Sequence, residues 1–187
     1  MVWSRFALSW VIVALACTGP LRAFGEEEAP PPPEAHAILV DETPVIDGIL
    51  DDAAWDKAEV IDRFTQVEPK NGEAPTYATE VRVLTDGETL FIGFRGYDDE
   101  PDKIVANRMG RDELFFYDDH FLVSIDPSHN HRSGYFFLVN ALGGRRDGSF
   151  ERDIVEANWD GIWYADSKLD AEGWTAEIAI PFRTVAL

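Results

Sequence analysis

The chain has 187 residues, of which 16 are Lys or Arg and 35 are Asp or Glu, and its formal net charge is −19. This length suits one domain with a full hydrophobic core and is short for two. So negative a chain lacks the clustered basic surface with which proteins bind nucleic acids or anionic membranes. With 45% hydrophobic and 12% aromatic residues it is also unlike a disordered acidic tail.

The first 25 residues have the order of a secretory signal peptide. Arg5 precedes an apolar run over 6–16, and Ala23 and Gly25 supply the small residues of a cleavage site. The run is too short to span a bilayer as a helix. We therefore expect export to the periplasm or outer membrane of a Gram-negative bacterium. The single cysteine, Cys17, lies in this segment, so the mature chain has no disulfide and no thiolate metal ligand.

Residues 26–37 are expected to form a linker rich in Glu and Pro. Three glutamates are followed by four consecutive prolines, which favour an extended polyproline conformation. From residue 38 to residue 187 the pattern changes to short apolar strands, and we assign this stretch to one domain.

Short runs of alternating apolar residues, separated by turns, predict an all-β fold. These runs lie at 80–83, 89–94, 121–125, 135–139, 163–169 and 174–180. Asp86-Gly87 between the first two favours a tight hairpin turn, and strands so evenly spaced predict an antiparallel β-sandwich. One short helix is expected near the start, over 51–58, where Asp51 would cap the first turn and Trp55 would point inward.

Common enzyme motifs are absent from the sequence: it has no Gly-x-Ser-x-Gly, no phosphate-binding loop, no dinucleotide fingerprint and no His-Glu-x-x-His. Asp119 and Asp126 bracket a predicted strand, and seven steps along a strand separate them by about 23 Å. The two carboxylates of a glycosidase lie roughly 5 to 9.5 Å apart. The sequence therefore favours a non-catalytic segment and leaves open a longer parent protein with glycoside hydrolase activity.

An acidic loop is a candidate calcium site. Asp98, Asp99 and Asp102 follow a predicted strand, and carboxylate oxygens in a loop are the ligands that calcium prefers. The alternative is a solvated acidic turn without a metal.

Aromatic and polar side chains at predicted strand ends form a candidate sugar-binding site. Flat rings stack on the apolar faces of sugars, while Arg, Asp and Asn form hydrogen bonds with the hydroxyl groups. The candidates are Phe116, Tyr117, Arg111, Asn140, Asp147 and Trp159. Phe116 with Tyr117 or Trp159 would form the platform, and the three polar residues would orient the hydroxyl groups. The alternative is that these residues are simple core rings and surface polar groups.

Six segments carry a family resemblance through their order and spacing. They are 44–55 (PVIDGILDDAAW), 78–84 (ATEVRVL), 90–94 (LFIGF), 118–126 (DDHFLVSID), 135–140 (YFFLVN) and 173–182 (GWTAEIAIPF). Together they resemble the family 9 carbohydrate-binding module, in the form found at the N-terminus of large bacterial envelope proteins. The resemblance covers roughly 38–187. It implies a jelly-roll or DOMON-like sandwich that binds an oligo- or polysaccharide between two aromatic side chains, with calcium in some members.

Two departures from that family bear on the expected site. Phe116 stands where binding members carry a tryptophan, three residues before Asp119, and the second aromatic wall of the family lies beyond the late strand. Because the sequence ends at Leu187, we expect the C-terminal strands of the sandwich to be missing and the chain to be part of something longer. In the larger envelope proteins an outer-membrane barrel follows, and the resemblance implies a parent that takes part in polysaccharide catabolism.

Two alternatives belong to other functional classes. The first is a structural or docking domain for an attached outer-membrane barrel. The second is a haem-binding electron-transfer domain, as in related sandwich domains. Its axial ligands would be Met109 and one of His36, His120, His129 and His131.

Overall fold

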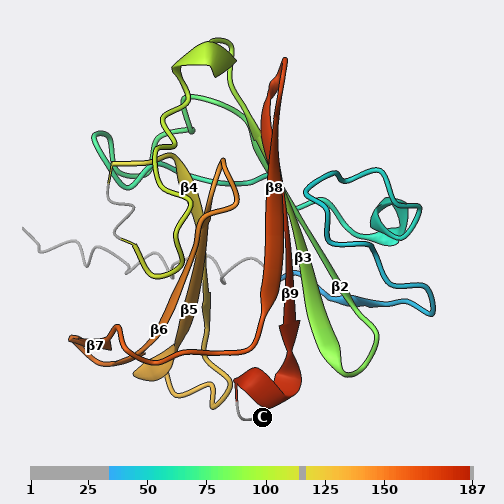
Figure 1. Cartoon of the computed structure of the whole chain (residues 1–187), viewed down its shortest axis with the longest axis vertical. Helices are drawn as coiled ribbons and strands as arrows, with labels where there is room; N and C mark the ends of the chain where they lie inside the picture. The colour runs from blue at the N-terminus through green and yellow to red at the C-terminus, as the bar shows by residue number, and fades with distance from the viewer. Residues whose placement is uncertain (1–33, 114–116, 186–187) are drawn as a thin grey trace, which may run out of the picture. The chain divides into compact units, whose positions relative to one another are not determined.

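Two β-sheets make up the fold of the computed structural model, which describes residues 34–113 and 117–185 (Figure 1). One sheet has the strand order β1-β2-β3-β9-β8 and the other the order β4-β5-β6-β7. The strands are β1 (Ile38–Leu39), β2 (Thr79–Thr85), β3 (Thr89–Tyr97), β4 (His120–Ile125), β5 (Ser133–Asn140), β6 (Arg145–Glu151), β7 (Ile154–Glu156), β8 (Tyr164–Asp170) and β9 (Gly173–Pro181). Only β1 and β2 pair in parallel; every other described pair is antiparallel.

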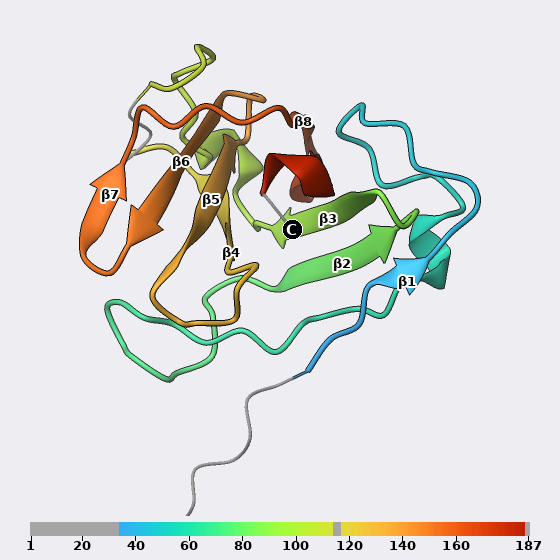
Figure 2. The same cartoon turned by 90° about the horizontal axis from the view of Figure 1, so that it is seen from below.

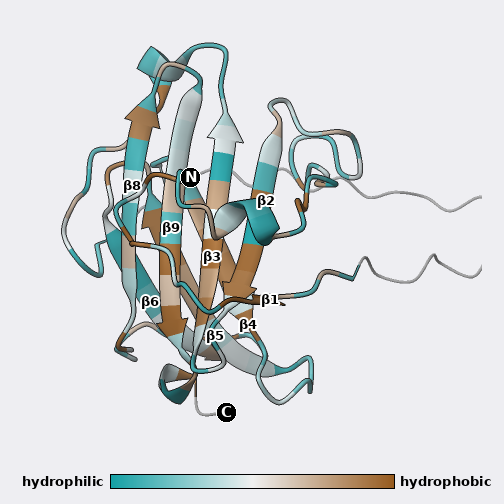
Figure 3. Ribbon diagram, turned by 90° about the vertical axis from the view of Figure 1, so that its right-hand side faces the viewer, coloured by the Kyte–Doolittle hydropathy of each residue, from teal (hydrophilic) through white to brown (hydrophobic). Residues whose placement is uncertain are grey.

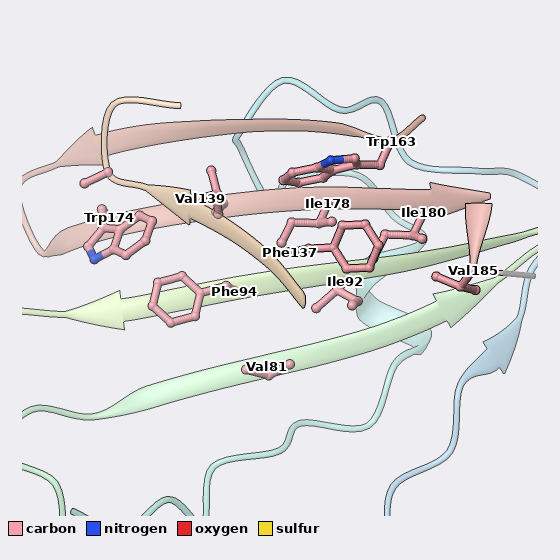
Figure 4. Close-up of a cluster of buried hydrophobic side chains, with 12 residues drawn as sticks. Val81, Ile92, Phe94, Phe137, Val139, Trp163, Trp174, Ile178, Ile180 and Val185 are labelled. Atoms are coloured by element: carbon pink, nitrogen blue, oxygen red, sulfur yellow. The ribbon is translucent and has the colours of Figure 1, made fainter. Parts of the chain in front are cut away.

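The main core lies between the two sheets, which Figure 2 shows from below. Alternation along each strand sends every second side chain into this layer, so Ile92 of β3 and Ile178 of β9 lie side by side in register. Phe137 of β5 faces them from the other sheet and is completely buried (Figure 4). The apolar residues that alternate along the strands are therefore the ones that pack the two sheets together.

A second core covers the opposite face of the five-stranded sheet. In Figure 3 the segment around β1 and the 3₁₀ turn η1 (Trp55–Lys57) lies in front of this sheet. Trp55 is 2% exposed and packs with Leu84 and Phe91. The segment crosses the sheet closely, because a Cβ atom on Gly48 would lie 2.7 Å from the backbone of Ser167 in β8.

The Glu177 side chain joins this N-terminal segment to the sheet. One carboxylate oxygen accepts a hydrogen bond from the indole of Trp55 at 2.8 Å, and the other accepts from the amides of Asp47 and Gly48, both at 2.9 Å. Glu177 is fully buried in β9. Burial raises the pKa of its carboxyl group by more than the three N–H donors lower it.

The predicted all-β sandwich is confirmed, with strands at all six predicted runs. The short helix predicted over 51–58 is wrong: turns and the three-residue η1 occupy this stretch, and no side chain caps η1. Asp52, rather than Asp51, binds a backbone amide here, that of Val45. Trp55 does point inward.

The structure also adds elements that the sequence did not predict. These are the strands β1, β6 and β7 and two further 3₁₀ turns, η2 (Pro101–Lys103) and η3 (Phe182–Thr184). The predicted signal peptide, the linker up to residue 33 and Phe116 lie outside the described residues. In the described stretches, no helix has the length and apolar character needed to cross a bilayer.

Candidate functional site

The buried side-chain amide of Asn140 fixes the segment between η2 and β4, which carries Arg111 and Tyr117 and which we call the loop. Asn140 is 0% exposed, and its Nδ2 donates to the carbonyl of Arg108 at 2.6 Å and to Asp118 at 2.9 Å. Its Oδ1 accepts from the amides of Leu142 and Gly144. All the hydrogen-bonding positions of Asn140 are thus occupied by the protein. The predicted contact between Asn140 and a sugar hydroxyl has no geometric support, and Asn140 instead positions the loop.

Asp118 completes the base of this loop. Its Oδ2 also accepts from the backbone amides of Asn107 and Arg108, at 2.9 and 3.2 Å. Burial works to raise the pKa of Asp118, but these amides and the Asn140 side chain outweigh it and lower the pKa below its usual value. Asp118 is therefore a charged acceptor that holds the chain on both sides of the loop.

Arg111 fixes the loop on β6, because the structure brings it together with Asp147. Its guanidinium donates to Asp147 at 3.2 Å, to the carbonyl of Gly161 at 2.9 Å and to Asp160. Asp147 is 0% exposed, and its second oxygen accepts from the Gly161 amide at 2.6 Å. Asp147 therefore holds Arg111 in place and is not itself in reach of a ligand, whereas Arg111 and Asp160 are exposed.

A hollow of about 290 Å³ lies beside Arg111, and we call it the arginine groove. It is lined by Arg111, Arg145, Asp160, Gly161, Ile162, Trp163 and Tyr164. A second hollow of about 490 Å³ shares Arg145 and Tyr164 with it and extends to Asp166 and Met109. Tyr164 is 55% exposed, which leaves an aromatic surface available where the two hollows meet.

Trp163 forms the buried part of the arginine groove. It packs edge-on against Phe137, with ring centroids 5.2 Å apart, and the guanidinium of Arg145 lies 5.8 Å from its ring centroid. Its indole nitrogen is the one buried side-chain polar atom without a hydrogen-bond partner within 34–113 and 117–185. The groove is thus built on the sandwich core rather than on a loop alone.

Trp159 and Tyr117, the described members of the predicted aromatic platform, do not line the arginine groove. Trp159 packs on Tyr135 and Phe137, with centroid distances of 4.6 and 6.0 Å, and lines a different hollow of about 400 Å³. Trp159 and Asp160 are neighbours in sequence, yet they face different hollows. Tyr117 is 93% exposed and lines none of the hollows described here. Its predicted role in sugar binding stays a prediction.

The three carboxylates predicted to hold calcium are not brought together. Asp98 accepts the amide of Glu100 at 2.7 Å, and Asp102 lies in the turn η2. Over the described part of the chain, no three Asp, Glu, His or Cys side chains lie close enough to share a metal ion. The acidic loop therefore has the geometry of the alternative, a solvated turn.

The candidate haem ligands are also separated. Met109 is 71% exposed beside the arginine groove, whereas His120 lines a hollow with Tyr77 and Trp174. His129 and His131 lie together in the exposed turn between β4 and β5, with ring centroids 4.6 Å apart. No hollow described here brings Met109 and a histidine together.

Comparison with known families decides the identity of the domain. The carbohydrate family 9 binding domain-like model matches residues 46–187. The chain belongs to this family. The resemblance seen in the sequence is thereby confirmed, and the family 9 match includes every residue of the arginine groove.

Solved structures similar to this family 9 domain support the fold. A Bacteroides uniformis protein assigned to carbohydrate binding is 13% identical, with a TM-score of 0.58, over 80% of this chain and 72% of that chain. A family 9 carbohydrate-binding module from Caldicellulosiruptor kristjanssonii, in complex with glucose, is 14% identical, with a TM-score of 0.57 and coverage of 82% and 72%. A module from the same organism, in complex with cellotriose, is 17% identical, with a TM-score of 0.53, over 78% of this chain and 66% of that chain. Among curated protein sequences nothing matches significantly.

Three residues of the family 9 groove were missed by the sequence analysis. Arg145 and Asp160 come from a polar strand and a loop, and Tyr164 begins β8 just after Trp163. The only signal for Arg145 was the Arg145-Arg146 pair in a strongly acidic chain. For Asp160 it was the Asp-Gly dipeptide, which indicates a turn.

Proposed function

We propose that this family 9 domain is a non-catalytic module that binds a saccharide in the arginine groove. The observation that carries the proposal is the junction of an exposed Tyr164 ring with a guanidinium and a carboxylate, those of Arg111 and Asp160, that are already held in place. An aromatic ring stacks on the C–H face of a sugar, and fixed charged groups bind its hydroxyl groups. Because Asp147 and Gly161 hold Arg111 before any ligand arrives, binding costs little ordering of that side chain.

Family membership and the relatives support the same function. The two Caldicellulosiruptor modules are in complex with glucose and with cellotriose. Neutral gluco-configured sugars are therefore a reasonable first test for this domain. The groove and its neighbouring hollow, about 290 and 490 Å³, have the size of small-molecule sites.

We further propose that the domain acts outside the cytoplasm, as part of an envelope protein of polysaccharide catabolism. This proposal rests on the signal-like order of the first 25 residues and on the family resemblance. An attached outer-membrane barrel, with this domain as its docking unit, is the competing context. Glycan binding that disappears when the domain is deleted, with barrel assembly unchanged, would favour the first context.

The experiment that tests sugar binding is isothermal titration of the full chain with glucose, cellotriose and a panel of oligosaccharides. Tyr164→Ala should weaken binding about tenfold or more, a loss of about 1.4 kcal/mol. Tyr77→Ala is the matched control, because Tyr77 is also partly exposed but lines a separate hollow. Failure of every saccharide to bind, or equal affinity of a folded Tyr164→Ala variant, would refute the proposal.

Tyr117→Ala in the same titration tests the earlier sequence-based platform. Unchanged affinity would remove Tyr117 from the site, and a loss comparable with that of Tyr164→Ala would assign Tyr117 to it. Folding of each variant is checked by its thermal melt. A bound ligand at 100 times its Kd should also raise the free energy of unfolding by about 2.7 kcal/mol.

A further inference from the structure

Arg145 is held rigidly at the junction of the arginine groove and its neighbouring hollow. Its backbone carbonyl accepts the amide of Asp112 at 2.9 Å, and its Nη1 donates to the carbonyl of Trp163 at 3.2 Å. The guanidinium also lies over the Trp163 ring. The side chain is half-buried and lines both hollows. Its position is therefore set by the protein before any ligand binds.

Arg145 has no carboxylate partner among the residues that the structure describes. No carboxylate of the described residues lies within 4.0 Å of its guanidinium, whereas Arg95 pairs with two acidic side chains and Arg111 with three. Of the buried and half-buried arginines that the structure describes, only Arg145 and its neighbour Arg146 lack an ion pair. The chain has 35 acidic residues against 16 basic ones, so acidic partners are not scarce.

The remaining donors of Arg145 are available to a ligand, because the described residues supply no other hydrogen-bond acceptor for its side chain. A guanidinium has five N–H groups, and the hydrogen bond to Trp163 uses one of them. Arg111 cannot play the same part, because its guanidinium is already paired with carboxylates, among them Asp147 and Asp160. Of the two arginines that line the groove, Arg145 is the one without an ion pair in the described residues, and a planar guanidinium fork matches a planar carboxylate.

We infer that the groove binds an acidic saccharide, with the carboxylate of a uronic acid unit paired to Arg145. This inference rests on the proposed saccharide binding and adds the class of sugar. Because Arg145 and Tyr164 line both hollows, the carboxylate would lie at their junction, and the Tyr164 ring would be available to stack on an adjacent sugar ring. The overall negative charge of the chain disfavours anions at long range, so this local cation decides the preference.

The test compares ligands that differ only in their carboxylate. The full chain is titrated with glucuronic acid against glucose, galacturonic acid against galactose, and trigalacturonate against its methyl ester. The acidic member of at least one pair should bind about tenfold more tightly than its neutral partner. Arg145→Gln should reduce that preference to about onefold and leave a cooperative melt.

Arg146→Gln is the matched control. It removes the same charge from the adjacent residue, which is also half-buried, but alternation along β6 places Arg146 on the opposite face of the strand. Its variant should keep the full preference for the acidic ligand. Equal loss in Arg146→Gln and Arg145→Gln would assign the preference to net charge and overturn the role of Arg145.

The remaining outcomes separate this inference from the proposed function. If neutral sugars bind as tightly as acidic ones, the acidic-saccharide inference fails while saccharide binding stands. If no sugar of either kind binds to the folded wild-type chain, the proposed function fails and the inference fails with it. If Arg145→Lys retains part of the preference for the acidic ligand, the positive charge accounts for that part. The bidentate geometry of the guanidinium then accounts for the part that is lost.

Discussion

Replacement of Glu177 by glutamine tests how the N-terminal segment is held on the sheet. One carboxylate oxygen accepts the Trp55 indole, and the other accepts the amides of Asp47 and Gly48. Glutamine has nearly the same shape, but its NH₂ group cannot accept a hydrogen bond. Either the indole or the pair of amides is therefore left facing another donor in a fully buried place.

The size of the effect follows from these bonds. A hydrogen bond to a charged acceptor contributes about 1.5–3 kcal/mol, and a buried donor left without an acceptor costs about 1–3 kcal/mol. Glutamine also removes a buried charge that has no ion-pair partner among the described residues, which offsets part of the loss. We expect Glu177→Gln to lower the free energy of unfolding by about 2–4 kcal/mol. For a domain of this size, Tm should fall by roughly 4–16 °C.

The assay is urea and thermal unfolding of the full chain, followed by tryptophan fluorescence. Glu88→Gln is the matched control, because Glu88 is exposed and its side chain has no hydrogen bond or ion pair in the described structure. This variant should stay within about 0.5 kcal/mol of the wild type. Equal stability of Glu177→Gln and Glu88→Gln would refute the role of the carboxylate.

The pH dependence of the same pair gives a second test. Burial raises the pKa of Glu177 above its usual 4.5, so the native state binds this proton more tightly than the unfolded state does. The corresponding stability is fully present below pH 4.5 and is lost as the pH rises through the raised pKa. The stability gap between the wild type and Glu177→Gln should therefore widen as the pH falls from 7 towards 4.5. A gap that narrows would contradict the assignment.

Three further substitutions test other parts of the fold. Gly48→Ala should destabilise by more than about 1 kcal/mol and by more than Gly87→Ala, because both have positive φ but only Gly48 approaches another strand; equal melting temperatures would contradict this. Asn140→Ala should lower the unfolding free energy by about 2–5 kcal/mol in urea, since four partners lose their hydrogen bonds to a buried side chain; a loss below 0.5 kcal/mol would be inconsistent with that role. The hydrogen bond from Arg95 lowers the pKa of Asp170, so the stability that the charged carboxylate gives is lost as the pH falls below about 3.8. The Tm of Asp170→Asn should therefore fall less than that of the wild type over this pH range.

The sandwich was predictable because alternation of apolar residues reports directly on the buried face of a strand. Phe137 and Ile178 lie in the core where their spacing placed them. β6 could not be predicted in this way, because its inward-facing residues are not apolar. Its inward positions Arg145 and Asp147 are polar, and their side chains form hydrogen bonds with Arg111, Gly161 and Trp163. Apolar alternation therefore predicts only those strands whose inward-facing side chains are apolar.

The candidate site was predicted only where residue type alone was informative. Arg111 and Asp147 do meet, but nothing local in the sequence shows that Asp160 joins them from a separate segment. Exposure is also set by the fold: Asn140 has the chemistry of a sugar-binding residue, yet its amide is fully used inside the protein. Composition identifies the chemistry, and only the tertiary contacts show which groups remain available to a ligand.

The hydrogen bonds that Glu177 accepts from the N-terminal segment also bear on the order in which the chain can fold. The Glu177 side chain links residues 129 and 130 positions apart, so the segment at Asp47 and Gly48 cannot be fixed on the sheet until β9 has been made. Contacts so distant in sequence slow folding, because the intervening chain must first be closed into a loop. A chain threaded stepwise through a translocon would stay incomplete until β9 emerged.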